Sequence, residues 1–225
     1  MLGRGWRGYM GFVVTLVVSG GCGDGDAVPI GAPADPCSPE LPANWAPTWR
    51  RPAVPQPGAC TLGQIDLEYA SCEGPSATSA RCSAFRNDAA NVVCVSCLFS
   101  DEGAALYGPI IRSDDVWRSN TAGCIALLDG DVSAGGCGAR VQASSSCYDA
   151  ACDGCAPVDA YVACRQKAAE TSCRQYYLDA VCLLRPQYAS CTEYASNREF
   201  FVAAATLFCS SGSSVNALRA GGAVE

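Results

Sequence analysis

The chain has 225 residues, a formal charge of −7, 17 cysteines, one lysine and no histidine. Without histidine, Ser-His-Asp and Cys-His nucleophile pairs and imidazole metal sites are excluded, so catalysis would need carboxylates, a thiolate or Lys167. The acidic balance excludes nucleic acid as an expected partner. No P-loop, dinucleotide fingerprint or GxSxG motif is present, and we expect no cofactor, no metal and no catalytic residue.

The first 21 residues have the pattern of a secretory signal peptide. Arg4 and Arg7 precede an apolar run, Met10 to Val18, and small residues follow at 19–21. This run is much shorter than the roughly 20 residues that a membrane-spanning helix needs. We therefore expect export of the chain, with residues 1–21 removed and no transmembrane span in the mature protein.

Cys22 follows the small residues directly. The sequence SGGC after an apolar run resembles the lipobox of bacterial lipoproteins, whose cysteine is diacylated and becomes the new N-terminus. The lipobox usually has an aliphatic residue where this chain has Ser19. The resemblance implies lipidation of Cys22 and stable attachment to a membrane through a two-chain anchor. The alternative is ordinary signal-peptidase cleavage after Gly21, which would make the protein secreted.

The cysteines of the mature chain indicate a disulfide framework, because export places them in an oxidising compartment. If Cys22 carries lipid, an even number remains, which permits complete pairing, although the connectivity does not follow from sequence. The cysteines expected in disulfides are Cys37, Cys60, Cys72, Cys82, Cys94, Cys97, Cys124, Cys137, Cys147, Cys152, Cys155, Cys164, Cys173, Cys182, Cys191 and Cys209.

Residues 22–59 are expected to form a lipid-anchored, proline-rich tether. Nine of the 13 prolines lie in this stretch, which disfavours helices and central strands and favours extended chain. Cys37 is expected to staple the tether to the domain behind it. Trp45 and Trp49 are expected to pack on that domain, with a recognition patch as the alternative reading.

The body, residues 60–210, has the pattern of a disulfide-rich helical domain. Residues 78–99 give the clearest helix, because Phe85, Val92 and Phe99 fall on one face. One short β-hairpin is expected near 104–118, where the helical period is lost. A Gly-rich break separates possible halves at 60–128 and 137–210. Further helices are expected at 121–128, 137–152 and 157–170, and a flexible tail at 211–225.

The second half of the body contains a regular cysteine series. Cys155, Cys164, Cys173, Cys182 and Cys191 are each nine residues apart. Nine residues in a helix turn the chain through about 900°, so successive cysteines of one long helix would point to opposite sides. The spacing therefore predicts at least three helical segments, with breaks near 171 and 184–188 and with bridges between different segments.

Two CxxC pairs occur, at Cys94–Cys97 and Cys152–Cys155. We expect structural disulfides, with a redox centre or a metal site as alternatives. Cys94 and Cys97 lie one turn apart on an expected helix, so bonding to two different partners is easier than bonding to each other. The acidic stretch 129–133 begins like a calcium loop but departs from that pattern at its sixth and twelfth positions, which favours a solvated loop.

The lipobox-like leader, the tether and the cysteine-dense body, including GPII (108–111) and AGCIALL (122–128), resemble cysteine-rich predicted lipoproteins of myxobacterial type. The resemblance implies a bacterial cell surface, and Gly23 after the lipidated cysteine implies the outer membrane. The hypothesis is a mainly α, disulfide-stapled helical domain that acts without catalysis as a surface-tethered binding or structural module for a protein or envelope component. The alternatives are a thiol–disulfide oxidoreductase using a CxxC pair and a carboxylate-based hydrolase.

Overall fold

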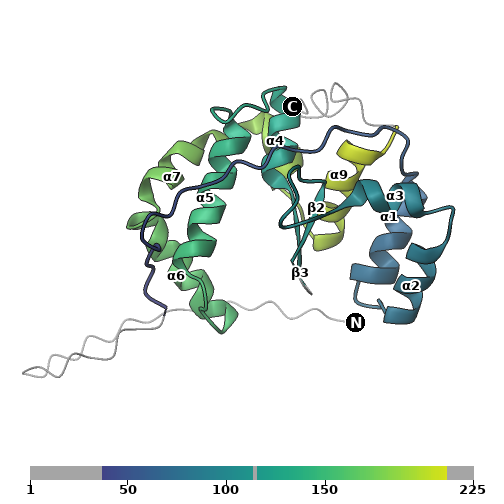
Figure 1. Cartoon of the computed structure of the whole chain (residues 1–225), viewed down its shortest axis with the longest axis horizontal. Helices are drawn as coiled ribbons and strands as arrows, with labels where there is room; N and C mark the ends of the chain where they lie inside the picture. The colour runs from purple at the N-terminus through teal and green to yellow at the C-terminus, as the bar shows by residue number, and fades with distance from the viewer. Residues whose placement is uncertain (1–36, 114–115, 212–225) are drawn as a thin grey trace, which may run out of the picture. The chain divides into compact units, whose positions relative to one another are not determined.

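A computed structural model describes residues 37–113 and 116–211 of the chain (Figure 1). Short helices and a small sheet are the regular elements of this part. The mainly α, disulfide-stapled fold predicted from sequence is confirmed. The signal peptide, Cys22 and nearly all of the expected tail lie outside the described residues. The α-helices are α1 (Leu62–Glu68), α2 (Ser79–Asn87), α3 (Val92–Leu98), α4 (Thr121–Asp129), α5 (Cys137–Ala151), α6 (Val158–Glu170), α7 (Arg174–Asp179), α8 (Ala189–Thr192) and α9 (Asn197–Cys209).

Polar side chains fix where several of these helices begin. Thr61 and Gln64 form a capping box at the start of α1, and Thr78 accepts a hydrogen bond from the backbone N–H of Arg81 in α2. At the start of α4, the Asn120 side chain accepts from the Gly123 N–H. A Cβ at Gly123 would come within 2.3 Å of that side chain, so only glycine leaves room for the cap.

The expected single helix over 78–99 is wrong: the chain forms α2 and α3 with a break between them. Asp88 is extended, at φ −71° and ψ 123°, and its carboxylate accepts from the Ala90 N–H. The buried Asn91 side chain donates to the Phe85 carbonyl at the end of α2. Local side-chain hydrogen bonds therefore compete with continued helix.

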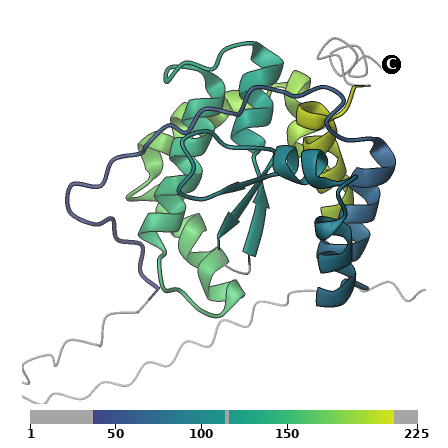
Figure 2. The same ribbon diagram turned by 45° about the vertical axis from the view of Figure 1, so that its right-hand side comes forward.

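A three-stranded sheet follows α3 and consists of β1 (Phe99–Asp101), β2 (Ile110–Ser113) and β3 (Val116–Ser119). Strands β2 and β3 are antiparallel, as the expected hairpin requires, and β1 adds a parallel pairing with β2 that sequence reasoning did not predict. Figure 2 shows β2 and β3 between the helices α5 and α6 on one side and α1 and α2 on the other.

The nine-residue cysteine series is distributed as the spacing predicts. Helix α6 ends at Glu170, α7 ends at Asp179, and two 3₁₀ segments, Ala180–Leu184 and Pro186–Tyr188, meet at the extended Arg185. The predicted breaks are confirmed, and so is bonding between segments for the cysteines of the series other than Cys155. The disulfides include Cys60–Cys94, Cys72–Cys82, Cys97–Cys209, Cys124–Cys191, Cys137–Cys182, Cys147–Cys173 and Cys152–Cys164.

The buried apolar residues form two clusters of very different composition. The larger cluster includes Ile65, Leu98, Ile125 and Phe201, and so mixes residues from both ends of the body. The smaller cluster, at the junction of α5, α6 and α7, has six buried members, which are four cysteines and two alanines. Disulfides there take the place of the large aliphatic side chains that usually fill a core.

Residues 37–59, which we call the strap, lie along the body instead of extending away from it as a spacer. In Figure 1 the strap runs from the region of α5 and α6, past α4, to the start of α1. The Trp45 ring stacks edge-on against Tyr176, and Trp49 packs against the larger core, as expected. Hydrogen bonds between strap and body join Glu40 to Ala151, Thr48 to Gln142, Trp49 to Val132, Arg51 and Ala53 to Tyr107, and Gln56 to Phe208.

Candidate binding site

The cysteines of the two CxxC pairs are mostly structural in this fold. Cys94 and Cys97 of the first CxxC pair are both buried on α3 and bond to Cys60 and Cys209, two different partners, as their spacing predicts. Cys152 of the second pair bonds to Cys164. The pairing expected for Cys37 and Cys155 stays a prediction.

In the acidic stretch 129–133, both carboxylates accept hydrogen bonds from other groups of the chain. Asp129 accepts a hydrogen bond from the Tyr188 hydroxyl, and Asp131 accepts one from the Ser133 N–H. These hydrogen bonds from Ser133 lower the pKa of the fully exposed Asp131 carboxyl. The exposed Asp131 agrees with the expected solvated loop, whereas Asp129 is the last residue of α4 and binds the buried Tyr188.

A cluster of two arginines and two glutamates is the most densely interacting group of charges in the described residues. Glu68 is the last residue of α1, and Glu73 ends the π-helical turn Tyr69–Glu73 that follows it. Arg86 comes from α2 and Arg112 from β2. The Cys72–Cys82 disulfide ties the π-helical turn to α2 and so fixes Glu73 near Arg86.

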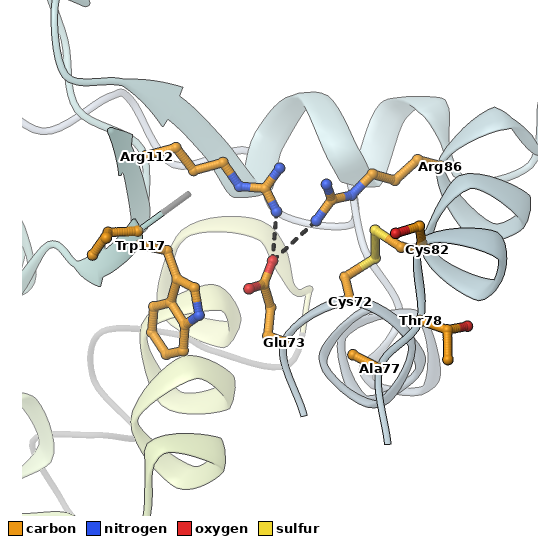
Figure 3. A pocket seen from close by; sticks show the side chains of 10 residues that line it. Cys72, Glu73, Ala77, Thr78, Cys82, Arg86, Arg112 and Trp117 are labelled. Carbon is orange, nitrogen blue, oxygen red and sulfur yellow. Dashed lines mark hydrogen bonds and ion pairs between the residues drawn. A yellow bond between two sulfur atoms is a disulfide. The ribbon is translucent and has the colours of Figure 1, made fainter. Parts of the chain in front are cut away.

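Glu73 joins the two guanidinium groups (Figure 3). Its Oε1 accepts from Nη2 of Arg86 at 3.0 Å and from Nη2 of Arg112 at 2.5 Å. Glu68 accepts from both Nε and Nη2 of Arg86, at 2.8 and 2.5 Å. Such charge-assisted bonds are stronger than neutral ones and hold planar groups in a defined orientation.

The aromatic ring of Phe99 supports both arginines. The guanidinium carbon of Arg112 lies 3.7 Å from the ring centroid, and that of Arg86 lies 5.1 Å from it. Cation–π attraction of this kind stabilises two like charges that would otherwise repel each other. The cluster therefore has a rigid base as well as internal ion pairs.

Burial shifts the pKa values of two groups of the cluster, Glu68 and Arg112. Glu68 is fully buried; burial raises the pKa of its carboxyl, and the hydrogen bond from Arg86 opposes that rise. Burial, together with the charge of Arg86, lowers the pKa of the Arg112 guanidinium, and Glu73 opposes this change. Glu73 and the two arginines are partly accessible, with side-chain exposures of 10%, 25% and 26%. Only these three charged groups of the cluster can meet a ligand.

A pocket of about 440 Å³ opens over this cluster, and we call it the Arg–Trp pocket. Figure 3 shows Glu73, Arg86 and Arg112 on one side of it and the Trp117 ring on another. Trp117 stands edge-on against Phe201 of α9, with the ring centroids 5.6 Å apart. The other residues that line the Arg–Trp pocket are Cys72, Ala77, Thr78, Ser79, Cys82 and Val116.

The register of the hairpin explains why Arg112 and Trp117 share a pocket. The two residues are cross-strand partners, so their side chains lie on the same face of the sheet. The neighbouring pair Ile111 and Arg118 lies on the opposite face and lines a second pocket of about 520 Å³.

The second pocket is acidic. It is lined by Glu102, Asp149 and Asp153, with Arg118 bound to both Glu102 and Asp149. The Tyr161 hydroxyl donates to Asp149 at 2.6 Å, and burial together with this bond raises the pKa of Tyr161 to about 12. The bond to Asp149 therefore persists through the physiological pH range.

One group of potential metal ligands occurs among the described residues. Ligand atoms of Glu68, Cys72 and Cys82 lie within 4.8 Å of one another. Zinc binds cysteine as a thiolate, and both sulfurs here are consumed by the Cys72–Cys82 disulfide. Glu68 is in addition bound to Arg86, so the oxidised chain does not offer a metal site at this position.

Sequence reasoning did not identify the five residues of this site: Glu68, Glu73, Arg86, Arg112 and Trp117. They come from five separate elements and share no motif. The one local signal was the spacing of Ile65 and Glu68, three residues apart on a short helix, which places a charge on the buried face.

Comparison of the chain with protein-family models, curated proteins and solved structures found no match. The many disulfides indicate an extracellular-type module formed in an oxidising environment. Within residues 37–113 and 116–211, no helix combines the length and the apolar character needed to cross a membrane.

Proposed function

We propose that the chain is a non-catalytic binding module of the bacterial cell envelope, tethered to the outer membrane by lipid on Cys22. The observation that carries the proposal is the Arg–Trp pocket, in which charged side chains are fixed around an open cavity. Its lining is held by a disulfide, by ion pairs and by Phe99 beneath the arginines. Such fixed polar groups beside an aromatic ring are typical of small-molecule sites.

The surroundings of Glu68 and Glu73 favour a binding function over a hydrolase that uses these carboxylates. A general acid or base must lie within hydrogen-bond reach of the substrate. Glu68, the carboxyl whose pKa is raised, is fully buried behind Arg86 and does not reach the pocket. Glu73 faces the pocket, but its Oε1 accepts from two guanidinium groups, which fix the carboxylate as a positioned acceptor.

The state of Cys94 and Cys97 argues against thiol–disulfide exchange at the first CxxC pair. An exchanging pair needs an accessible sulfur for attack by a thiolate. Cys94 and Cys97 are 0% and 7% exposed, and each bonds to a distant partner instead of to the other. Breaking either bond would release a core contact and would not open a reactive CxxC pair.

The lipid anchor is tested by fractionating cells that express the wild-type chain or Cys22→Ala. The wild-type protein is expected in the membrane fraction with incorporated labelled palmitate. Cys22→Ala is expected to lose the label and to leave the membranes or remain unprocessed, while the control Ser38→Ala behaves as the wild type. Unchanged size, label and location of Cys22→Ala would refute the anchor.

Binding is tested by sedimenting isolated cell envelopes with purified Cys22→Ala chain, which lacks the anchor. We expect saturable binding that Arg112→Lys weakens and that the exposed control Arg140→Lys leaves unchanged. Binding that all three proteins share would place the contact outside the Arg–Trp pocket. Absence of binding by the parent chain would refute the proposed function.

A further inference from the structure

The four charges of the cluster beneath the Arg–Trp pocket cancel as a set, and each guanidinium has a carboxylate oxygen 2.5 Å from its Nη2. Arg86 and Arg112 are paired with Glu68 and Glu73, so the cluster as a whole carries no net charge when all four groups are ionised. The chain carries a net charge of −7, which repels anions at a distance. A cation would meet two guanidinium groups inside the pocket. The electrostatics therefore favour an uncharged ligand.

The pocket nevertheless has hydrogen-bonding groups for a polar ligand. Arg112 binds Glu73 through Nη2, and among the described residues no acceptor pairs with its Nε or Nη1. These two donors lie on different edges of the planar guanidinium, so each offers a hydrogen bond in a fixed direction to a separate oxygen atom. Glu73 uses Oε1 for both arginines, so its other carboxylate oxygen can accept a hydroxyl proton.

Trp117 adds an apolar surface next to these groups. Its ring packs edge-on against Phe201 and contributes to the pocket wall, and Val116 beside it is 70% exposed. An indole ring offers a broad flat surface at low entropic cost, because the side chain has only two rotatable bonds. A ligand that suits the pocket has hydroxyls along one edge and C–H groups across one face.

We infer that the Arg–Trp pocket binds an uncharged saccharide, with Arg112 and Glu73 hydrogen-bonded to adjacent hydroxyls and the sugar ring lying against Trp117. This inference rests on the proposed function and names the ligand class of that site. A pocket of about 440 Å³ is within the range of small-molecule sites and holds roughly one or two pyranose rings. The Cys72–Cys82 disulfide and the ion pairs keep the site formed before the ligand arrives, which lowers the entropic cost of binding.

The test is saturation-transfer NMR on the purified full-length chain with a panel of neutral disaccharides: cellobiose, maltose, lactose and chitobiose. At least one is expected to bind, with an affinity that does not change with ionic strength, because no net charge is neutralised. Arg112→Lys keeps the charge and loses the fixed directions of the guanidinium donors, and is expected to weaken binding about tenfold. Trp117→Ala is expected to weaken it by a similar factor, while Arg140→Lys leaves it unchanged.

Trp117 also packs in the core, so Trp117→Ala is interpreted only if its thermal transition matches that of the wild type. Arg112→Lys keeps the test decisive if Trp117→Ala fails to fold. Saccharide binding that Arg112→Lys leaves unchanged would overturn the inference. Salt-sensitive binding of galacturonate without binding of any neutral sugar would do the same. Pocket-dependent envelope binding without a saccharide signal would refute the ligand class and leave the proposed function standing, whereas loss of both would refute both.

Discussion

Removing the disulfide between Cys97 and Cys209 is expected to destabilise the fold more than removing a local bridge. This bond joins α3 to the end of α9 across a sequence separation of 112. In the variant Cys97→Ala/Cys209→Ala, the Cys124–Cys191 bridge still shortens that loop. There are 27 residues from Cys97 to Cys124 and 18 from Cys191 to Cys209, so the bond effectively closes a loop of about 45 residues.

Closing a loop of that length stabilises the folded state by about 4 kcal/mol in the chain-entropy account. Both sulfurs are buried, so lost packing adds to the effect in the same direction. For a protein of this size, 4 kcal/mol lowers Tm by roughly 8–16 °C. The Cys72–Cys82 bond closes a separation of 10, for which the same account gives somewhat under 3 kcal/mol.

The assay is thermal and urea unfolding followed by circular dichroism for the wild type, Cys97→Ala/Cys209→Ala and the control Cys72→Ala/Cys82→Ala. We expect the first variant to have the lower Tm and urea midpoint of the two. An equal or smaller loss for Cys97→Ala/Cys209→Ala would show that loop length does not determine how these bonds stabilise the chain.

Three further predictions concern single residues. Glu68→Ala removes the buried partner of Arg86, which keeps its ion pair with Glu73, and is expected to cost about 1.5–3 kcal/mol in urea unfolding, whereas Glu102→Ala, in an exposed pair, costs less than about 1 kcal/mol; similar losses would contradict the burial argument. Asn120→Ala removes the α4 cap and the donor to the buried Gly108 carbonyl, whereas the Tyr107 carbonyl keeps its bond from the Ala53 N–H; the expected loss is about 2–3 kcal/mol, against almost none for the exposed Asn87→Ala. The pKa of Tyr161 is about 12 in the folded chain and 10 in the unfolded chain, so its contribution to the free energy of unfolding is complete below pH 10 and falls as the pH rises to 12. Tyr161→Phe should reduce this loss of stability between pH 10 and pH 12. An unchanged pH profile of stability would refute the raised pKa of Tyr161.

The parts of the fold that depend on local arithmetic were predictable from sequence. The nine-residue cysteine spacing required several short helices, and Pro186 placed a break that the extended Arg185 bears out. The hairpin was visible because its two strands are adjacent in the chain. The break between α2 and α3 was not predicted because the helical spacing of Phe85, Val92 and Phe99 favours one helix, whereas the short side chains of Asp88 and Asn91 bond to nearby backbone.

The parts that depend on contacts between distant segments were not predictable. Strand β1 has three residues and pairs in parallel with β2, so it leaves no alternating pattern long enough to recognise. The prolines of the strap indicated extended chain but not the surface on which it lies. The Arg–Trp pocket depends on the register that sets Arg112 opposite Trp117 and on the disulfide that brings Cys72 to Cys82, and neither pairing follows from one sequence.

Full reduction and alkylation followed by thermal circular dichroism tests most directly whether disulfides hold this domain together. The fully buried members of the smaller cluster are four cysteines and two alanines, and the larger side chains packed against it are only partly buried, so we expect it to bury too little apolar area to offset the entropy of the chain once its bridges are open. We predict that the reduced and alkylated chain loses its cooperative transition, while the oxidised chain keeps it. The same cooperative transition in both forms would contradict the account.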